Sequence, residues 1–451
     1  MILNTKINNK LTSSFLASLV MLSGVGVSVS NNVSAATTVL NNQKSDKSTQ
    51  EVDFFTKQQV IEDIDYVMST IKKIHVGCVH EIPKEVLNQR NIEIQNLSES
   101  TSIVEEWRII SRILAKLHDA HTQIFPPEIL YKKYIPLIIR GEGNKFFCKS
   151  GEFKDAEIIE INGLKISDIY ENFKDNFSYE IEEWPHLHFF EFPACFTQFN
   201  LARAGVDIFK PLEITFKTDD GVKIQKFEFV NVVPKVKKNV PFVSYKIDKE
   251  NSTGIFTLNS CDFNHEYCNT VDKFFAEVAS NNIKNVIVDL RRNVGGNSDV
   301  SNYFAKYMKN LKNIKTHKNE IRTGDKIYVE KLTYTQEYLK NFQAKKNLFD
   351  GKVYILTSNM TFSSAMLFAR DFSDNRLATI VGEVPGNSPT CFGSVFNQKC
   401  FTPNSKLIFK TTYKKFYRTD STKDPNRLIP DIAVSAKESL SEVYKIIQKN
   451  M

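Results

Sequence analysis

Hydrophobic residues recur along this chain with two different spacings, and the changes of spacing divide it into regions. Between residues 53 and 127 they recur every three or four positions, which is the period of an α-helix, so this region is expected to be helical. Residues 128–240 contain short alternating runs separated by turn residues, which indicates a small β-rich segment. In residues 241–451, apolar runs of strand length alternate with amphipathic helices. The pattern therefore predicts an α/β domain that follows a helical region and a β-rich segment.

The N-terminus has the pattern of a secretory leader. In residues 1–35, two lysines precede an apolar run from Phe15 to Val29, and Val33–Ala35 supplies small residues before a cleavage site. Residues 36–52 are polar and are expected to form a linker. A retained membrane anchor is the alternative, but the Ser and Gly residues of the run and the cleavage site favour removal. The mature chain is thus expected to have no stable membrane span and to be secreted or associated with the cell envelope.

Cleavage is expected between Ala35 and Ala36, because small residues occupy both recognition positions. Intact-mass analysis of the exported protein should therefore find an N-terminus at or near Ala36. A mass that retains residues 1–35 would contradict this prediction.

Charge and cysteine content argue against several classes of function. The net charge of +7 is spread along the chain without a basic stripe, so nucleic-acid binding is not indicated. The seven cysteines include no CxxC pair and the eight histidines no HExxH motif, which argues against a zinc site. Cys391 and Cys400 could close a disulfide in an oxidising exterior, or could be two separate buried thiols. No metal or organic cofactor is expected.

Two segments of the C-terminal region could carry chemistry. An apolar strand over residues 286–290 runs into Gly295 and Gly296, whose backbone N–H groups could form an oxyanion hole. Further on, Thr361–Ala365 puts Ser363 at the start of a helix, where its hydroxyl would be exposed as a nucleophile. Taken alone, such a serine is more often a helix cap and a glycine pair is more often a turn. The combination favours acyl transfer, most simply the hydrolysis of peptide bonds.

Five segments, in order, resemble the motifs of the C-terminal-processing and tricorn-like serine peptidases, the tail-specific proteases. They are similar to the family's L-x-D-G-H-T element, its DLR-x-N-x-GG signature, its nucleophile segment, its VGE strand end and its terminal PDI: Leu117–Thr122, Asp289–Gly296, Thr361–Ala365, Ile380–Glu383 and Pro430–Ile432. The resemblance implies a crotonase/ClpP-like β/α catalytic domain. Residues 158–166 are similar to the end of the PDZ-like module that several members insert before that domain.

The resemblance also implies roles for individual residues. Ser363 matches the nucleophile, and Gly295 or Gly296 together with the backbone amide of Ser364 would form the oxyanion hole. One branch of the family activates its serine with a lysine about 25 residues later. This chain has Ser388 at that position, which argues against a Ser–Lys dyad.

The tricorn-like branch instead uses a histidine from the N-terminal region and an acid shortly before the PDI motif. His121 matches the histidine, and His118 would replace it if the register differed. Asp424 matches the acid, with Asp420 as the second candidate. A neutral imidazole can accept the proton of the serine hydroxyl near pH 7 while a carboxylate orients the ring. A Ser–His–acid triad is therefore expected.

The sequence predicts an exported serine endopeptidase that cleaves peptide or protein substrates through an acyl-enzyme on Ser363, with His121 as general base. The main alternative is a non-catalytic protein of the same fold that binds an apolar ligand or a peptide, which the 34 Phe residues would suit. A third interpretation is an envelope adaptor that binds peptides through the PDZ-like segment. The joint presence of a serine, a histidine and an acid at matching positions favours the enzyme. The sequence predicts no oligomeric state.

Overall fold

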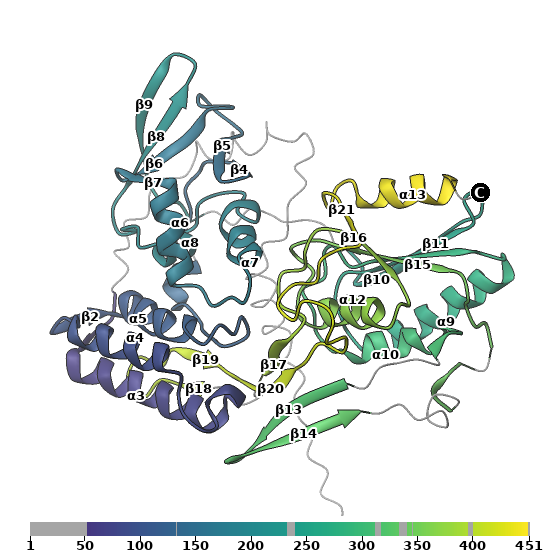
Figure 1. Cartoon of the computed structure of the whole chain (residues 1–451). Coiled ribbons are helices and arrows are strands. Elements are labelled where there is room, and N and C mark those ends of the chain that lie inside the picture. Colours follow the sequence, from purple (N-terminus) through teal and green to yellow (C-terminus); the bar gives the residue numbers. More distant parts are fainter. Residues whose placement is uncertain are drawn as a thin grey trace, which may run out of the picture. The chain divides into compact units, whose positions relative to one another are not determined.

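The structure, a computed structural model, describes residues 52–131, 133–231, 240–311, 317–332, 341–344, 346–395 and 400–449. The predicted leader (1–35) and the linker apart from Val52 lie outside these residues. The described chain forms two compact units, whose elements are labelled in Figure 1. The first contains 128–174 and 186–231, and the second contains 52–127, 175–185 and the described residues from 240 onward.

The first unit is built on an antiparallel sheet in the order β4-β5-β6-β8-β9, with the short β7 paired to β6. Leu212, Ile214 and Phe216 alternate along β8 and are fully buried, as expected for a strand with one face in a core. Asn162 and Gly163 both have positive φ and join β6 to β7 as a two-residue hairpin. The elements of this unit are β4 (Ile139–Glu142), β5 (Lys145–Cys148), β6 (Glu157–Ile161), β7 (Leu164–Lys165), β8 (Leu212–Thr218), β9 (Gly221–Phe227), α6 (Ile166–Asp175), α8 (Gln198–Arg203) and the helical turns η2 (Glu128–Tyr131) and η3 (Leu187–Glu191).

The second unit is built on a six-stranded sheet in the order β10-β11-β12-β15-β16-β21. Only the edge pair β10–β11 is antiparallel, and the other neighbours are parallel. Its strands are β10 (Val243–Asp248), β11 (Thr253–Leu258), β12 (Asn285–Asp289), β15 (Lys352–Thr357), β16 (Thr379–Gly382) and β21 (Ile432–Ala433). The helices packed on it are α9 (His265–Ser280), α10 (Asp299–Ala305), α12 (Ser364–Asp374) and α13 (Ser439–Lys449). The short helix α7 (Glu183–His186) has most of its residues in the same unit. The predicted mixed α/β fold is therefore confirmed.

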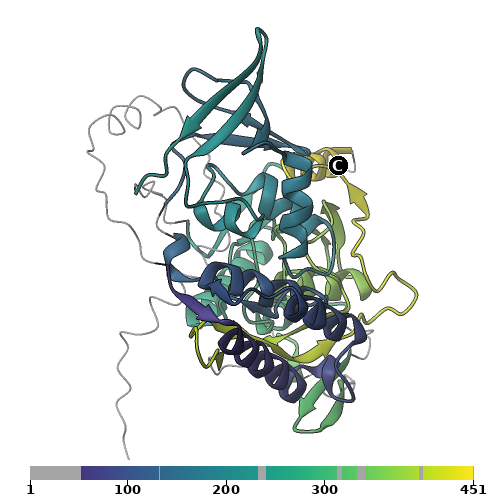
Figure 2. The same cartoon turned by 90° about the vertical axis from the view of Figure 1, so that its left-hand side faces the viewer.

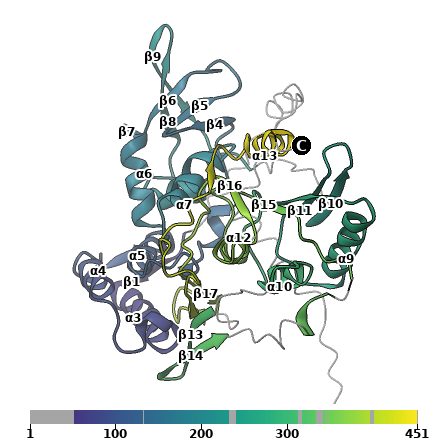
Figure 3. The same cartoon turned by 45° about the vertical axis from the view of Figure 1, so that its right-hand side comes forward.

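Both faces of this sheet are covered by helices, as parallel sheets require. Val286 and Val288 of β12 point into a core that also holds apolar residues of α9, α10 and α12, such as Phe368. Ile287, which lies between them on the other face, packs in a second cluster with Val443 of α13. Figures 1 and 3 show α13 on one side of the sheet and α9, α10 and α12 on the other. The continuous apolar run of β12 is explained by burial on both faces.

The helical region belongs to the second unit. Its helices are α3 (Lys57–Ile74), α4 (Lys84–Gln95) and α5 (Ile103–Ala115), with the small pair β1 (Phe54–Thr56) and β2 (Ser100–Ser102) and the turn η1 (Val76–Cys78). Figure 2 shows these purple and blue helices lying together. The chain leaves α5 through a short loop into β3 (Gln123–Ile124), which pairs with β19 (Ile408–Lys410). Buried Trp107 of α5 donates a hydrogen bond to the carbonyl of Ile124 (3.2 Å). These contacts fix the loop that carries His121.

The remaining strands form two small sheets of the second unit. The first has the order β14-β13-β20-β17, and the second has the order β18-β19-β3. Their bounds are β13 (His317–Thr323), β14 (Lys326–Leu332), β17 (Cys391–Val395), β18 (Cys400–Phe401) and β20 (Thr412–Phe416). Cys391 and Cys400 lie in different sheets, are buried and form no disulfide with each other. Within the part of the chain that the structure describes, no helix is both long and apolar enough to cross a membrane.

Candidate active site

Ser363 lies at a strained backbone position directly before helix α12. Its φ of 53° and ψ of −124° are values that residues other than glycine rarely adopt. The side chain of Asn387 holds this conformation by accepting a hydrogen bond from the Ser363 backbone N–H (2.8 Å). The Ser363 hydroxyl makes no capping bond to α12. The helix-cap interpretation therefore does not describe this serine, and its hydroxyl is available to another partner.

That partner is His121. Its Nε2 atom lies 2.9 Å from the Oγ atom of Ser363, although the two residues are 242 positions apart in the chain. The imidazole packs on the ring of Phe362 (centroids 4.9 Å apart), and Trp184 stacks on Phe362 at 4.1 Å. His118, the neighbouring candidate, is instead exposed and lies near Glu85. Of the two candidate histidines, His121 is the one that contacts the serine.

The carboxylate of Asp119 holds the loop that carries His121 through several hydrogen bonds. Its Oδ1 accepts a hydrogen bond from the His121 backbone N–H (2.9 Å). Its Oδ2 accepts hydrogen bonds from the hydroxyls of Thr122 (2.6 Å) and Thr412 (2.7 Å), and it lies 3.2 Å from Nε2 of His75. Burial alone would raise the pKa of Asp119, but the hydrogen bond and charge of His75, assisted by His121 and Thr122, lower it to about 2. Asp119 is therefore ionised. Its Oδ1 is 3.8 Å from Nδ1 of His121, which is too far for a hydrogen bond.

A second carboxylate, Glu180, lies beside the same imidazole. One carboxylate oxygen of Asp119, one ring nitrogen of His121 and one carboxylate oxygen of Glu180 lie within 4.8 Å of one another. Nδ1 of His121 and Oε1 of Glu180 are both buried and have no hydrogen-bond partner, whereas Oε2 of Glu180 accepts the backbone N–H of Ser388 (2.9 Å). This set of side chains could also hold a divalent metal ion. The sequence does not reveal Glu180 as a site residue, because nothing in its local pattern distinguishes it from other polar residues.

Burial shifts the pKa values of His121 and Glu180 in opposite directions. It lowers the pKa of His121 from its ordinary value, with partial opposition from the charge of Asp119. Burial also raises the pKa of Glu180 well above its ordinary value, and the nearby charge of Asp119 adds to this. A histidine with a lowered pKa is neutral near pH 7, which is the form that can accept a proton.

The glycine turn lies against the nucleophile. Gly295 and Gly296 have φ values of 105° and 137°, which favour glycine. The N–H of Gly295 donates to the side chain of Asn293 (2.8 Å), so this group already has an acceptor. Among the described hydrogen bonds, none engages the backbone N–H of Gly296 or of Ser364, while the Ser364 hydroxyl donates to the Gly296 carbonyl (2.7 Å). Of the three expected oxyanion-hole donors, Gly296 and Ser364 are thus the two that remain available.

The two acids predicted from the sequence, Asp424 and Asp420, have no described contact with His121. Asp424 is exposed, accepts the N–H of Asn426 (2.8 Å), and is held through its carbonyl by Arg418. Asp420 is buried and accepts the hydroxyl of Thr422 (2.6 Å). No described contact joins Asp424 to His121, so its role as the third residue stays a prediction.

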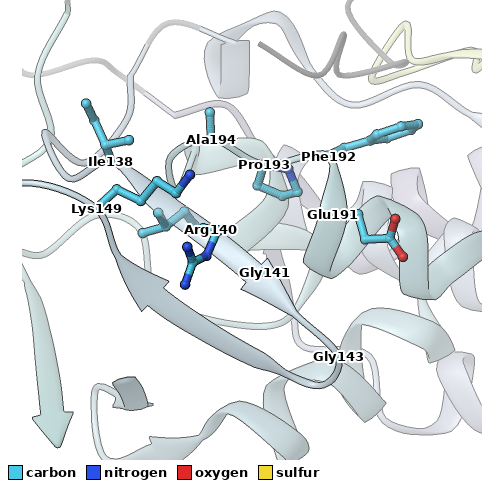
Figure 4. Close-up of a pocket in the computed structure, with 10 residues that line it drawn as sticks. Ile138, Arg140, Gly141, Gly143, Lys149, Glu191, Phe192, Pro193 and Ala194 are labelled. Carbon is cyan, nitrogen blue, oxygen red and sulfur yellow. The ribbon is translucent and has the colours of Figure 1, made fainter. Parts of the chain in front are cut away.

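The first unit contains a separate pocket of about 390 Å³. It is formed by residues 138–141 with Gly143 and Lys149 and by residues 191–194, and Figure 4 shows Arg140, Lys149 and Glu191 around it. None of the expected catalytic residues lines this pocket.

A mixed α/β domain with a serine and a histidine in hydrogen-bond contact is typical of serine hydrolases. Residues 252–434 match the model of peptidase family S41. The match spans less than half of the chain. The resemblance to C-terminal-processing and tricorn-like serine peptidases is confirmed, and with it a peptidase function that acts on peptide or protein substrates.

The fold is also similar to solved structures. The crystal structure of mature CPAF is 12% identical in sequence, with a TM-score of 0.57, and the match covers 87% of this chain and 96% of that one. Mature CPAF in complex with lactacystin gives the same identity and TM-score, with coverage of 87% and 97%. At this level of identity the similarity concerns the fold.

Proposed function

We propose that the protein is an exported serine endopeptidase in which Ser363 attacks the substrate carbonyl and His121 acts as general base. The observation that carries this proposal is the 2.9 Å contact between Nε2 of His121 and Oγ of Ser363. A contact of this length is within the range for proton transfer between a base and a nucleophile. The available N–H groups of Gly296 and Ser364 support it.

The reaction would follow from this arrangement. Nε2 of His121 accepts the proton of the Ser363 hydroxyl while Oγ forms a bond to the scissile carbonyl carbon. The resulting oxyanion accepts hydrogen bonds from the N–H groups of Gly296 and Ser364. His121 then returns the proton to the leaving amine, and water hydrolyses the acyl-enzyme by the same steps in reverse order. Asp424 stays the sequence-based prediction for the acid of the triad.

Two finer features belong to the same proposal. The catalytic domain is of the crotonase/ClpP-like type, and the first unit is a partial PDZ-like module; both follow from the resemblance of the motifs. Export follows from the leader predicted over residues 1–35. The non-catalytic binding protein is the competing function, and Phe362 and Trp184 beside the serine would give it an apolar wall.

Hydrolysis by the purified mature protein tests the proposal. It is expected to cleave casein and internally quenched peptides, and a fluorophosphonate should abolish this cleavage by reacting with the nucleophilic serine. EDTA should leave the rate unchanged, since no metal takes part in the proposed steps. A protein that binds peptides or apolar ligands but cleaves none of these substrates would favour the competing function.

Gly295→Ala is expected to abolish activity and to lower the melting temperature. A Cβ atom at this position would lie 2.6 Å from Cβ of Ser363 and 3.1 Å from the N atom of Ser364, and the positive φ adds strain. Gly324→Ala is the matched control, because Gly324 also has a positive φ (62°) but faces open space. This control should lose some stability and keep its kcat/KM. Equal activity in both variants would mean that the glycine turn is not part of the site.

A further inference from the structure

The imidazole of His121 lacks a partner on one side. Nε2 contacts Ser363, but Nδ1 is buried and has no hydrogen-bond acceptor. For Nε2 to accept the proton of Ser363, Nδ1 must carry the hydrogen, and a buried N–H without an acceptor is costly. The base therefore requires an acceptor close to Nδ1.

Two carboxylates lie near enough to be considered. Asp119 is already occupied: Oδ1 accepts the His121 backbone N–H, and Oδ2 lies within hydrogen-bond distance of His75 and accepts the hydroxyls of Thr122 and Thr412. Glu180 differs from Asp119, since its Oε1 is buried and makes no hydrogen bond of normal geometry. The backbone N–H of Phe392 and the side chain of Asn387 lie close enough to its carboxyl group to oppose the rise of its pKa. One ring nitrogen of His121 and one carboxylate oxygen of Glu180 lie within 4.8 Å of each other, and Nδ1 and Oε1 are the buried atoms of these two side chains that lack a hydrogen-bond partner. A buried donor site and a buried acceptor of this kind are complementary.

Glu180 is held in place by its surroundings. Its Oε2 accepts the backbone N–H of Ser388, which leaves only Oε1 free to turn toward His121. The segment that carries Glu180 is fixed at both ends: the Ser178 hydroxyl donates to the Asp119 carbonyl (2.7 Å), and Trp184 stacks on Phe362. A side chain anchored in this way can orient a ring with little entropic cost.

We propose that Glu180 is the positioning acid of His121: its carboxylate accepts the Nδ1–H of the imidazole and so fixes the tautomer whose Nε2 is free to accept the Ser363 proton. This inference rests on the proposed peptidase function. The remaining gap closes by rotation of the Glu180 side chain or is bridged by one water molecule. Glu180 forms no bond to substrate and transfers no proton in the reaction.

The pH dependence of the enzyme should report this coupling. Glu180 is faced by the carboxylate of Asp119, the imidazole of His121 and the thiol of Cys391. One proton added to the Glu180–His121 pair inactivates the base on either residue. On His121 it protonates the imidazole, and on Glu180 it removes the carboxylate that accepts the Nδ1–H bond. Removing the carboxylate should therefore move the ascending limb of kcat/KM to lower pH.

The decisive variant is Glu180→Gln. Its amide oxygen can still accept the Ser388 N–H, but its NH2 group would face Nδ1 and favour the tautomer with hydrogen on Nε2. The expected result is a fall in kcat of roughly 10³- to 10⁴-fold with little change in KM, as when a triad acid is replaced by its amide. The residual activity should show the ascending limb of kcat/KM at a lower pH than in the wild-type enzyme. Glu180→Asp, which keeps the charge, should recover part of the rate.

The control is Glu182→Gln, the same chemical change on an exposed residue of the same segment, and it should leave kcat unchanged. Asp424→Asn tests the competing acid. If Asp424→Asn loses the rate and Glu180→Gln keeps it, the inference is overturned while the peptidase stands. If Ser363→Ala itself keeps activity, the proposed function fails, which is a different result.

A measurement without turnover separates positioning from folding. Nitrogen-15 NMR of histidine-labelled wild-type protein should find hydrogen on Nδ1 of His121 in the active pH range, and in Glu180→Gln it should find hydrogen on Nε2. If the variant does not fold, the wild-type spectrum decides alone. A neutral His121 with hydrogen on Nε2 at the pH of full activity would overturn the proposal.

Discussion

Ser363→Ala is expected to reduce kcat/KM by roughly 10⁴- to 10⁶-fold. The change removes the Oγ atom that lies 2.9 Å from Nε2 of His121, and with it the covalent route. Because the Ser363 hydroxyl makes no capping bond to α12, the variant should fold normally. Rates of hydrolysis of a quenched peptide, with the melting temperature measured in parallel, check this result.

Ser364→Ala is the matched control. Ser364 is expected to contribute its backbone N–H, which the substitution keeps, while its hydroxyl only donates to the Gly296 carbonyl. The loss of one such hydrogen bond should cost at most about tenfold in rate. Equal losses in the two variants, or unchanged turnover in Ser363→Ala, would refute the assignment of the nucleophile.

His121→Ala should lose nearly as much activity as Ser363→Ala, because nucleophile and base act as a unit. Without the imidazole, the Ser363 hydroxyl has no group to accept its proton near neutral pH. Combining both substitutions should therefore add little to either one alone, which steady-state rates of the two single variants and the double variant would measure.

His118→Ala provides the control for this second prediction. His118 is only three positions away but is exposed and lies near Glu85, so its removal should leave kcat/KM unchanged. If His121→Ala remains folded and active, the triad interpretation fails. Asp424→Ala, at the acid position expected from the sequence, should lose far less than His121→Ala, because Asp424 is exposed and has no described contact with His121.

The elements around the nucleophile could be predicted from local pattern alone. The strand expected at 286–290 is β12 (Asn285–Asp289), and the helix expected from Ser363 is α12 (Ser364–Asp374). Both have strong apolar signals because they lie in the same core. The short strand β19 (Ile408–Lys410) pairs with the two-residue strands β18 and β3, and β3 comes from the helical region, so no local pattern specifies this pairing.

The site itself could be predicted only in part. Ser363 and His121 are found through family motifs, but no spacing in the sequence indicates that residues 242 positions apart are in contact. The sequence offers both glycines as oxyanion-hole donors, whereas the Asn293 side chain engages one of them, and side-chain directions cannot be read from a motif. Glu180 has no motif at all. Its place beside His121 depends on a bond to Ser388, 208 positions away.

The most direct test of the catalytic assignment is the mass of the protein after reaction with a fluorophosphonate, followed by peptide mapping. The account predicts one adduct per chain, carried by Ser363, with labelling lost in Ser363→Ala and strongly slowed in His121→Ala. An adduct on another serine, or wild-type labelling in Ser363→Ala, would contradict it.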